Sequence, residues 1–253
     1  MPIEILPISR QGRGAFDEGR IQEHKPIGFP QDGGAGKQIS SLFYWAHAWS
    51  DAGGLIDQHP HEGFEIMSYV LKGEIEHYDS RLKGWKTLSA GDVQLIRAGD
   101  GIVHAEKLLP RSAIYQIWFD PNLEVSLAHP ASYDDYPAAT CPVRRDGGQS
   151  TKVIMGEGGP MRMETPGVTI EDQSFLAGTY TMPCDPNRVY ITCLIEGQLE
   201  LNGQTAPQGA SARIRGEGPL AIVAGAPARW FVIGAPAIPP YRTYAQMHRL
   251  SVS

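Results

Sequence analysis

The stretch that decides the fold is HPHEGFEIMSYVLKGEIEHYDS, residues 59–80, and it is followed by AGDVQLIRAGDGIVHAEK, residues 90–107. The first segment opens with His59-Pro60-His61, and the second contains His104-Ala105-Glu106. In an extended strand, side chains two residues apart point to the same face, so each pair can direct both members at one point. Two such strands facing each other give three imidazoles and a carboxylate, which suit a divalent transition metal. Ordinary structural histidines are the alternative, and the paired spacing argues against it.

The residues around both pairs predict short β-strands. Apolar and β-branched residues mark extended segments at 65–71, 74–78, 93–96 and 102–106. Lys72-Gly73 and the run from Ala98 to Gly101 supply the turns. Short strands at even spacing with Gly-rich turns favour a closed antiparallel barrel or jelly roll over a helical architecture.

These two segments resemble the characteristic sequence of the pirins, which are two-domain members of the cupin superfamily. The resemblance implies that His59, His61, His104 and Glu106 are ligands of iron, as Fe²⁺, and nickel, manganese, copper and zinc remain alternatives. It also implies that Glu65 is not a ligand, and a role behind the ligands or a purely structural role are both open for it.

A weak internal repeat predicts how the second half is built. Residues 194–200 echo residues 70–76 at an offset of 124, which suggests a duplicated barrel. At this offset His59 and His61 correspond to Pro183 and Asp185, and residues 130–247 contain no histidine. The second barrel should therefore lack the ligands of the first.

Together with the resemblance, the repeat predicts an all-β protein of two tandem cupin (jelly-roll) β-barrels, with a metal site in the N-terminal barrel only. We expect the N-terminal metal-binding barrel at residues 1–130, a linker at 131–142, and a degenerate C-terminal barrel with a tail at 143–253. Three further groups should be structural. His77 should make a hydrogen bond behind the ligands, the aromatic run Phe43-Tyr44-Trp45 should pack in the core, and Cys141, Cys184 and Cys193 should be free thiols.

Composition excludes some partners. No run approaches the ~20 apolar residues of a membrane span, so we expect a cytoplasmic protein with no membrane partner. The net charge is −6, and residues 1–140 carry 12 Lys and Arg against 19 Asp and Glu. An acidic metal-bearing half lacks the positive surface that binds phosphate backbones, which argues against direct nucleic-acid binding.

Two functions follow as hypotheses. Because some pirins cleave quercetin, the resemblance implies a quercetin 2,3-dioxygenase, an oxidoreductase that acts on a small aromatic or enediol-type substrate with dioxygen. Glu106 would then complete the ligand set or act catalytically by accepting the substrate hydroxyl proton. The alternative is a non-catalytic regulator whose metal redox state sets its affinity for a cytoplasmic protein partner. Fold alone does not decide between them.

Overall fold

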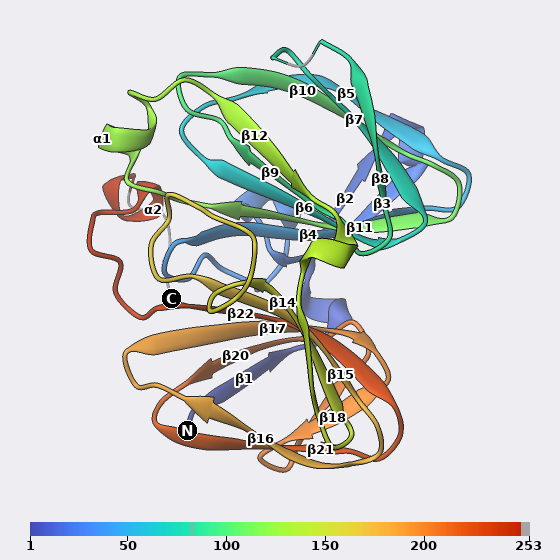
Figure 1. The fold of residues 1–253 in the computed structure, drawn as a ribbon, viewed down its shortest axis with the longest axis vertical. Helices are drawn as coiled ribbons and strands as arrows, with labels where there is room; N and C mark the ends of the chain where they lie inside the picture. The colour runs from blue at the N-terminus through green and yellow to red at the C-terminus, as the bar shows by residue number, and fades with distance from the viewer. Residues whose placement is uncertain (82, 249–253) are drawn as a thin grey trace. The chain divides into compact units, whose positions relative to one another are not determined.

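The computed structural model describes residues 1–81 and 83–248, which are mostly β-strand (Figure 1). The chain forms two compact units. Of the described residues, we call 11–81, 83–140, 163–166 and 241–248 the N-terminal unit, and residues 1–10, 141–162 and 167–240 the C-terminal unit. Each unit contains one seven-stranded and one four-stranded antiparallel sheet, so the predicted all-β class and two-unit organisation are confirmed. Within the described residues, no helix has the length and apolar character needed to cross a membrane.

The N-terminal unit carries the strands that the sequence predicts around the histidine pairs. Its large sheet has the order β12 (Ser132–Tyr136), β9 (Val93–Arg97), β6 (Glu65–Lys72), β11 (Ser112–Phe119), β4 (Leu42–Ser50), β3 (Ile21–Ile27) and β2 (Gly12–Phe16). Its small sheet has the order β5 (Gly54–His61), β10 (Ile102–Leu108), β7 (Glu74–Asp79) and β8 (Trp85–Ser89). Two four-residue helices, α1 (Leu123–Ser126) and α2 (Tyr244–Met247), belong to the same unit.

The C-terminal unit repeats this arrangement. Its large sheet has the order β1 (Ile3–Leu6), β20 (Ser211–Arg215), β17 (Arg188–Glu196), β22 (Ala228–Pro236), β15 (Thr169–Phe175), β14 (Gln149–Met155) and β13 (Val143–Asp146). Its small sheet has the order β16 (Gly178–Cys184), β21 (Gly218–Ala224), β18 (Gln198–Leu201) and β19 (Gln204–Pro207). Strand for strand, both sheets match those of the N-terminal unit, which confirms the duplication.

The repeated segments make the same turn in both units. Gly73 joins β6 to β7 with φ +69°, and Gly197 joins β17 to β18 with φ +76°. A side chain at Gly73 would place its Cβ 2.7 Å from the Ser112 hydroxyl, and one at Gly197 would place it 2.6 Å from the Pro227 carbonyl oxygen. Both positions therefore require glycine for backbone conformation and for space.

The register of the second barrel corrects the predicted correspondence by one residue. His104 pairs with His59 on β5, whereas the equivalent strands β21 and β16 pair Leu220 with Met182. His59 and His61 therefore correspond to Met182 and Cys184, and not to Pro183 and Asp185. The repeat offset was read from the turn, and a slip of one residue exchanges the two faces of a strand. In agreement, Pro183 is exposed, whereas Cys184 is buried.

The barrel interiors differ in chemistry. In the C-terminal unit, the positions equivalent to His104, Glu106 and His77 hold Leu220, Ile222 and Leu201, which pack into one apolar cluster with Cys184. In the N-terminal unit a smaller apolar cluster fills part of the interior, with the members Ile21, Ala48, Ile56, Val70, Ile75, Leu88, Leu108 and Ile114. Another apolar cluster contains Ile66, Ile96 and Ile102, and the buried polar groups of the interior form the candidate site.

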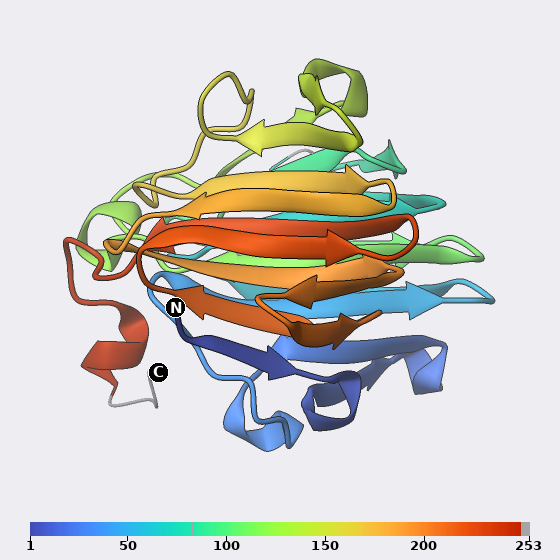
Figure 2. The same cartoon turned by 90° about the horizontal axis from the view of Figure 1, so that it is seen from below.

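The unit boundaries differ from the expected 1–130, 131–142 and 143–253. Residues 3–6 form β1 and pair with β20 in the C-terminal unit, as the dark blue edge strand in Figure 2 shows. The expected linker contains β12, which pairs with β9 in the N-terminal unit, where Asp134 and Asp135 accept hydrogen bonds from Arg97 and Gln94. Part of the expected tail, residues 241–248, lies in the N-terminal unit, and 249–253 fall outside the described residues. An unpaired strand edge gains backbone hydrogen bonds from any extended segment, and sequence order does not dictate the choice.

Candidate metal centre

Two adjacent strands of the small sheet supply the predicted ligands. His59 and His61 share the inward face of β5, and His104 and Glu106 share the inward face of β10. His104 lies directly opposite His59, and the β5–β10 pairing shifts by one residue between His104 and Glu106. On its other side, β10 pairs His104 with Asp79 and Glu106 with His77 of β7. Register alone therefore brings these groups together.

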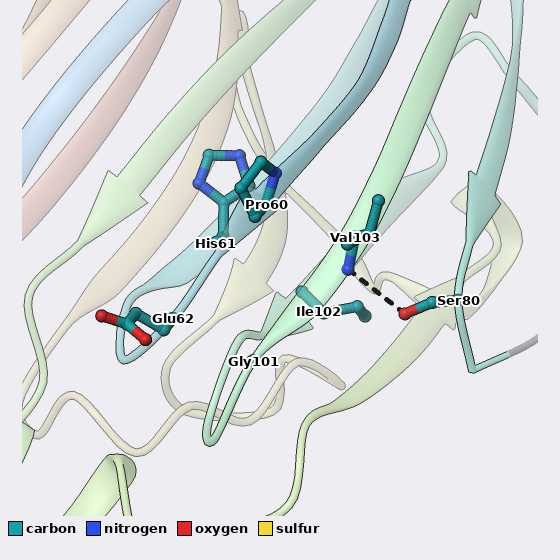
Figure 3. Close-up of a pocket in the computed structure, with 7 residues that line it drawn as sticks. All are labelled: Pro60, His61, Glu62, Ser80, Gly101, Ile102 and Val103. Carbon is teal, nitrogen blue, oxygen red and sulfur yellow. Dashed lines mark hydrogen bonds between the residues drawn. The ribbon is translucent and has the colours of Figure 1, made fainter.

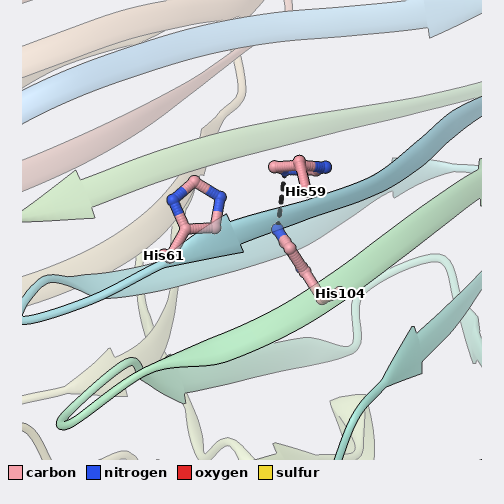
Figure 4. A group of neighbouring side chains, drawn as sticks. All are labelled: His59, His61 and His104. Atoms are coloured by element: carbon pink, nitrogen blue, oxygen red, sulfur yellow. Dashed lines mark hydrogen bonds between the residues drawn. The ribbon is translucent and has the colours of Figure 1, made fainter.

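The three histidines form one compact group (Figure 4). Their possible ligand atoms all lie within 4.8 Å of one another, and the Nε2 atoms of His59 and His104 are 2.9 Å apart. Glu106 does not belong to this group. It lies instead in a second group with His77 and His104, in which the ligand atoms are also within 4.8 Å of one another. His104 is common to both groups.

Hydrogen bonding and packing orient the imidazoles. The Nδ1 atom of His59 lies 2.7 Å from the Asp57 carbonyl oxygen, which can only accept, so Nδ1 carries the proton and Nε2 keeps its lone pair. The His61 ring meets the Trp118 ring edge to face with centroids 4.8 Å apart. The Nε2 atom of His61 is buried and has no hydrogen-bond partner among the described residues. A buried, unpaired nitrogen beside two other imidazoles is a feature that a bound cation would explain.

Burial keeps two of the histidines neutral. It lowers the pKa of His61 to about 3, with smaller contributions from His104 and His59. It lowers the pKa of His104 to about 2, again followed by the neighbouring His59 and His77. Both groups lose their protons far below neutral pH. Neutral imidazole is the form that ligates metals.

Glu106 is held by two donors that sequence reasoning missed. Ser68 Oγ donates to Glu106 Oε1 at 2.9 Å, and Gln116 Nε2 donates to Oε2. Gln116 is itself oriented by Trp118 Nε1, which donates to its Oε1 at 3.2 Å. Each carboxylate oxygen has two lone pairs, so one remains on each for a metal or a proton. The sequence signal for Ser68 and Gln116 is a polar residue within an otherwise apolar strand. Such a side chain is expected to be buried and therefore to need a hydrogen-bond partner.

His77 and Glu65 both lie outside the group of three histidines. His77 is fully buried, and its Nε2 is 3.3 Å from Asp79 Oδ2. Glu65 faces the other way and holds the segment 163–166, because its carboxylate accepts hydrogen bonds from the Glu164 and Thr165 amides at 2.8 Å and from the Thr165 hydroxyl at 2.6 Å. These contacts give Glu65 a structural role.

An open pocket borders the cluster. Its volume is about 510 Å³, and its walls are Pro60, His61, Glu62, Ser80, Gly101, Ile102 and Val103 (Figure 3). Ser80 Oγ accepts a hydrogen bond from the Val103 amide at 3.2 Å, which ties the ends of two strands together at the rim. His61 is the one predicted ligand in this wall, so the pocket leads from solvent to the histidine cluster.

The other sequence-based expectations concern packing. Phe43, Tyr44 and Trp45 are all buried in β4. Phe43 and Tyr44 pack with Phe29 and Trp118, so the aromatic run is core, as predicted. Cys141, Cys184 and Cys193 are buried and form no disulfide among the described residues, which agrees with the expectation of thiols.

Comparison with known sequences supports the resemblance to pirins. The sequence model of the pirin family matches residues 41–119. The chain is 37% identical over 122 residues to pirin-like protein 2 of Arabidopsis thaliana, which covers 47% of this chain and 36% of the relative. It is 30% identical over 168 residues to a pirin-like protein of Caulobacter vibrioides. That match covers 62% of this chain and 59% of the relative. It is also 40% identical over 75 residues to a quercetin 2,3-dioxygenase of Escherichia coli K12. That match covers 28% of this chain and 32% of the relative. The chain thus spans less than two thirds of the length of each of these relatives.

Comparison with solved structures concerns the fold. The bacterial pirin YhhW from Escherichia coli, in complex with nickel(II), has a TM-score of 0.78 to this chain and 21% sequence identity. The match covers 94% of this chain and 100% of that one. The similarity therefore extends over both units, well beyond the segment that the family model matches. The resemblance to the pirins is confirmed, and residues 41–119 are the segment of this chain that matches the pirin family model.

Proposed function

We propose that this chain is a metal-dependent oxygenase of the quercetin 2,3-dioxygenase type. The observation that carries the proposal is a cluster of three histidines, one of which forms the wall of an open pocket. A structural metal site is closed, whereas a catalytic one keeps a position open to solvent and substrate. Relatives named quercetin 2,3-dioxygenase support the reaction class.

We assign His59, His61, His104 and Glu106 as the ligands. Two nitrogen ligands at right angles, each about 2.1 Å from one ion, would lie about 3 Å apart. The 2.9 Å between the Nε2 atoms of His59 and His104 fits this arrangement, and so does the unpaired Nε2 of His61. Three neutral imidazoles and one carboxylate suit a divalent first-row metal. Iron is our choice on family resemblance, and the nickel in YhhW supports a divalent ion without deciding which.

The protein groups have separate tasks in this proposal. When bound, the metal would supply a Lewis acid and redox centre that polarises a catechol-like or enediol-like oxygen. Glu106 would accept the substrate hydroxyl proton, or complete the ligand set. Ser68 and Gln116 each donate a hydrogen bond to its carboxylate, and together they hold it at a fixed position beside the histidines.

The oxygenase proposal is tested by oxygen consumption. We expect the iron-loaded chain to consume dioxygen with quercetin, and the His59→Ala variant to be at least ~100-fold slower, since losing a ligand disrupts the centre more than losing an outer-shell contact. An oxygen electrode and the disappearance of flavonol absorbance measure the rate. The exposed histidine His248 belongs to neither cluster, so His248→Ala is the matched control and should react like wild type.

A bound metal without turnover would contradict this function. If iron is retained but catechol leaves its optical spectrum unchanged and quercetin drives no oxygen uptake, the oxygenase proposal fails. The regulatory alternative predicts instead that the ferrous and ferric forms of the protein differ in affinity for a protein partner. A tenfold difference corresponds to about 1.4 kcal/mol.

We also propose a single metal site per chain. The positions in the C-terminal barrel that correspond to the ligands hold Met182, Cys184, Leu220 and Ile222, and three of these are buried among apolar side chains. Such a set provides no imidazole or carboxylate. Elemental analysis of protein saturated with iron and then desalted should give one ion per chain, and two tightly held ions would contradict the proposal.

A further inference from the structure

The C-terminal barrel contains a second pocket, of about 340 Å³, at the place where the N-terminal barrel holds its histidine cluster. Met182, which corresponds to His59, is one of its walls. Val232 and Gly234 form the floor, and the sheet register places them where the N-terminal unit has Gln116 and Trp118. Duplication has thus kept a pocket while replacing the histidines around it.

Two positions of this pocket hold charged residues where the N-terminal unit has uncharged ones. Arg188 corresponds to Phe64 by the repeat offset, and Glu171, which lies opposite Val232, corresponds to Ala46, which lies opposite Gln116. Placing a cation and an anion in a barrel interior costs free energy unless each finds a partner.

Arg188 is oriented but carries no ion pair. Its Nη2 atom donates to Thr169 Oγ1 at 3.0 Å, and its guanidinium lies 6.0 Å from the centre of the Tyr190 ring. Among the described residues, no carboxylate forms an ion pair with it. A Cβ at position 234 would lie 2.9 Å from Arg188 Nη2 and 2.7 Å from Thr169 Oγ1, so Gly234 leaves the space that the guanidinium occupies. Arg188 therefore offers donors in a fixed direction.

Glu171 is held in place by a hydrogen-bond network. Gln173 Oε1 accepts from Trp230 Nε1 at 2.8 Å and from Gln149 Nε2 at 3.2 Å. These two hydrogen bonds orient the Gln173 side-chain amide, and its Nε2 donates to Glu171 Oε2 at 2.7 Å. Among the described residues, the other carboxylate oxygen of Glu171 has no hydrogen-bond partner, and it is the pocket's free acceptor.

We propose that this pocket binds a small carboxylate that bears a hydroxyl or amino group on its α-carbon. Arg188 would bind the carboxylate, for which a guanidinium is geometrically matched, and Glu171 would accept a hydrogen bond from the α-substituent. Thr169, which accepts a hydrogen bond from Arg188, and Glu171 are two residues apart on one strand, so their side chains point to the same face. Arg188 and Glu171 both line the pocket, so one small ligand that carries both groups can contact them together. The proposal does not depend on the metal centre.

Calorimetric titration of the 253-residue chain tests the proposal. The probes are L-lactate and L-alanine, with propionate, which lacks the donor, and lactamide, which lacks the charge. We expect one of the first two to bind at one site per chain, and both propionate and lactamide to bind at least tenfold more weakly. The comparison of lactate with alanine decides whether the α-substituent is a hydroxyl or an ammonium group.

Four variants locate the binding. Arg188→Gln should weaken it at least tenfold, Glu171→Gln should reduce the preference over propionate, and Arg10→Gln, at an exposed arginine of the same unit, should change nothing. Hydroxy acids also chelate metals, so His61→Ala serves as a control for binding at the metal centre. This variant should bind the lactate or alanine probe as the wild-type chain does. Binding that survives in Arg188→Gln but is lost in His61→Ala would place the ligand on the metal centre and overturn the proposal. Failure of both lactate and alanine to bind the wild-type chain would overturn it as well.

Discussion

We expect the His104→Ala variant to bind its metal at least ~100-fold more weakly than the wild-type chain, since removing even an outer-shell partner of a ligand costs about 10–100-fold. His104 is completely buried and is the one residue common to both ligand groups. Its loss also leaves His59 without the nitrogen that lies 2.9 Å away. Competition with a chromophoric chelator measures the affinity.

Folding of this variant must be checked separately. Circular dichroism and thermal unfolding of the metal-free forms show whether the barrel survives the loss of the ring, and His104→Gln, which keeps more of the volume, serves as a second variant. The His248→Ala control should keep wild-type affinity. Full metal retention in folded His104→Ala and His104→Gln would remove the ligand assignment.

The second large effect concerns Glu65. We expect Glu65→Ala to lower the free energy of unfolding by about 3 kcal/mol, because it leaves two buried donors of Thr165 and the partly buried Glu164 amide without an acceptor. Burial raises the pKa of Glu65, and the hydrogen bonds from Thr165 and Glu164 oppose that shift by stabilising the charged form. Thr165 is itself fully buried, so water does not readily replace the carboxylate. Urea unfolding measures the loss.

Two further measurements separate this local anchor from a general effect. Glu65→Gln keeps the shape and should lose less stability, while Glu62→Ala, at an exposed neighbouring carboxylate, should stay within ~0.5 kcal/mol of wild type. Hydrogen exchange at the Glu164 and Thr165 amides should speed up most in Glu65→Ala. Unchanged exchange there would show that the contact contributes little.

The sequence predicted the parts of the fold that local patterns control. A mostly apolar run defines β6, the turn at Gly73 and an alternating pattern define β7, and the spacing of His59 with His61 places both on one face of β5. The repeat predicted the second barrel because its turn at Gly197 needs the same backbone conformation. These features depend on neighbouring residues only.

Long-range pairing could not be predicted in the same way. The residues of β12 do not by themselves distinguish a strand from a linker. Their strand conformation depends on pairing with the edge of β9. The Pro183 and Asp185 correspondence was wrong by one residue because a repeat offset carries no information on which strand face points inward. Likewise, Gln116 and Ser68 became recognisable as site residues only when the sheets placed them against Glu106.

The pairing of β1 with β20 also constrains how the protein can be made. Ile3 pairs with Ile214, so the ribosome synthesises β1 about 210 residues before its partner. At about 5–20 residues per second, β1 waits roughly 10–40 s. During that time this short, partly apolar strand stays unpaired, while the residues of the N-terminal unit, which follow it in the sequence, form their sheets. A nascent chain that is released early, or that pauses before β20, therefore has an exposed strand available for another chain, and we expect aggregation during expression to be sensitive to mutations in residues 3–6.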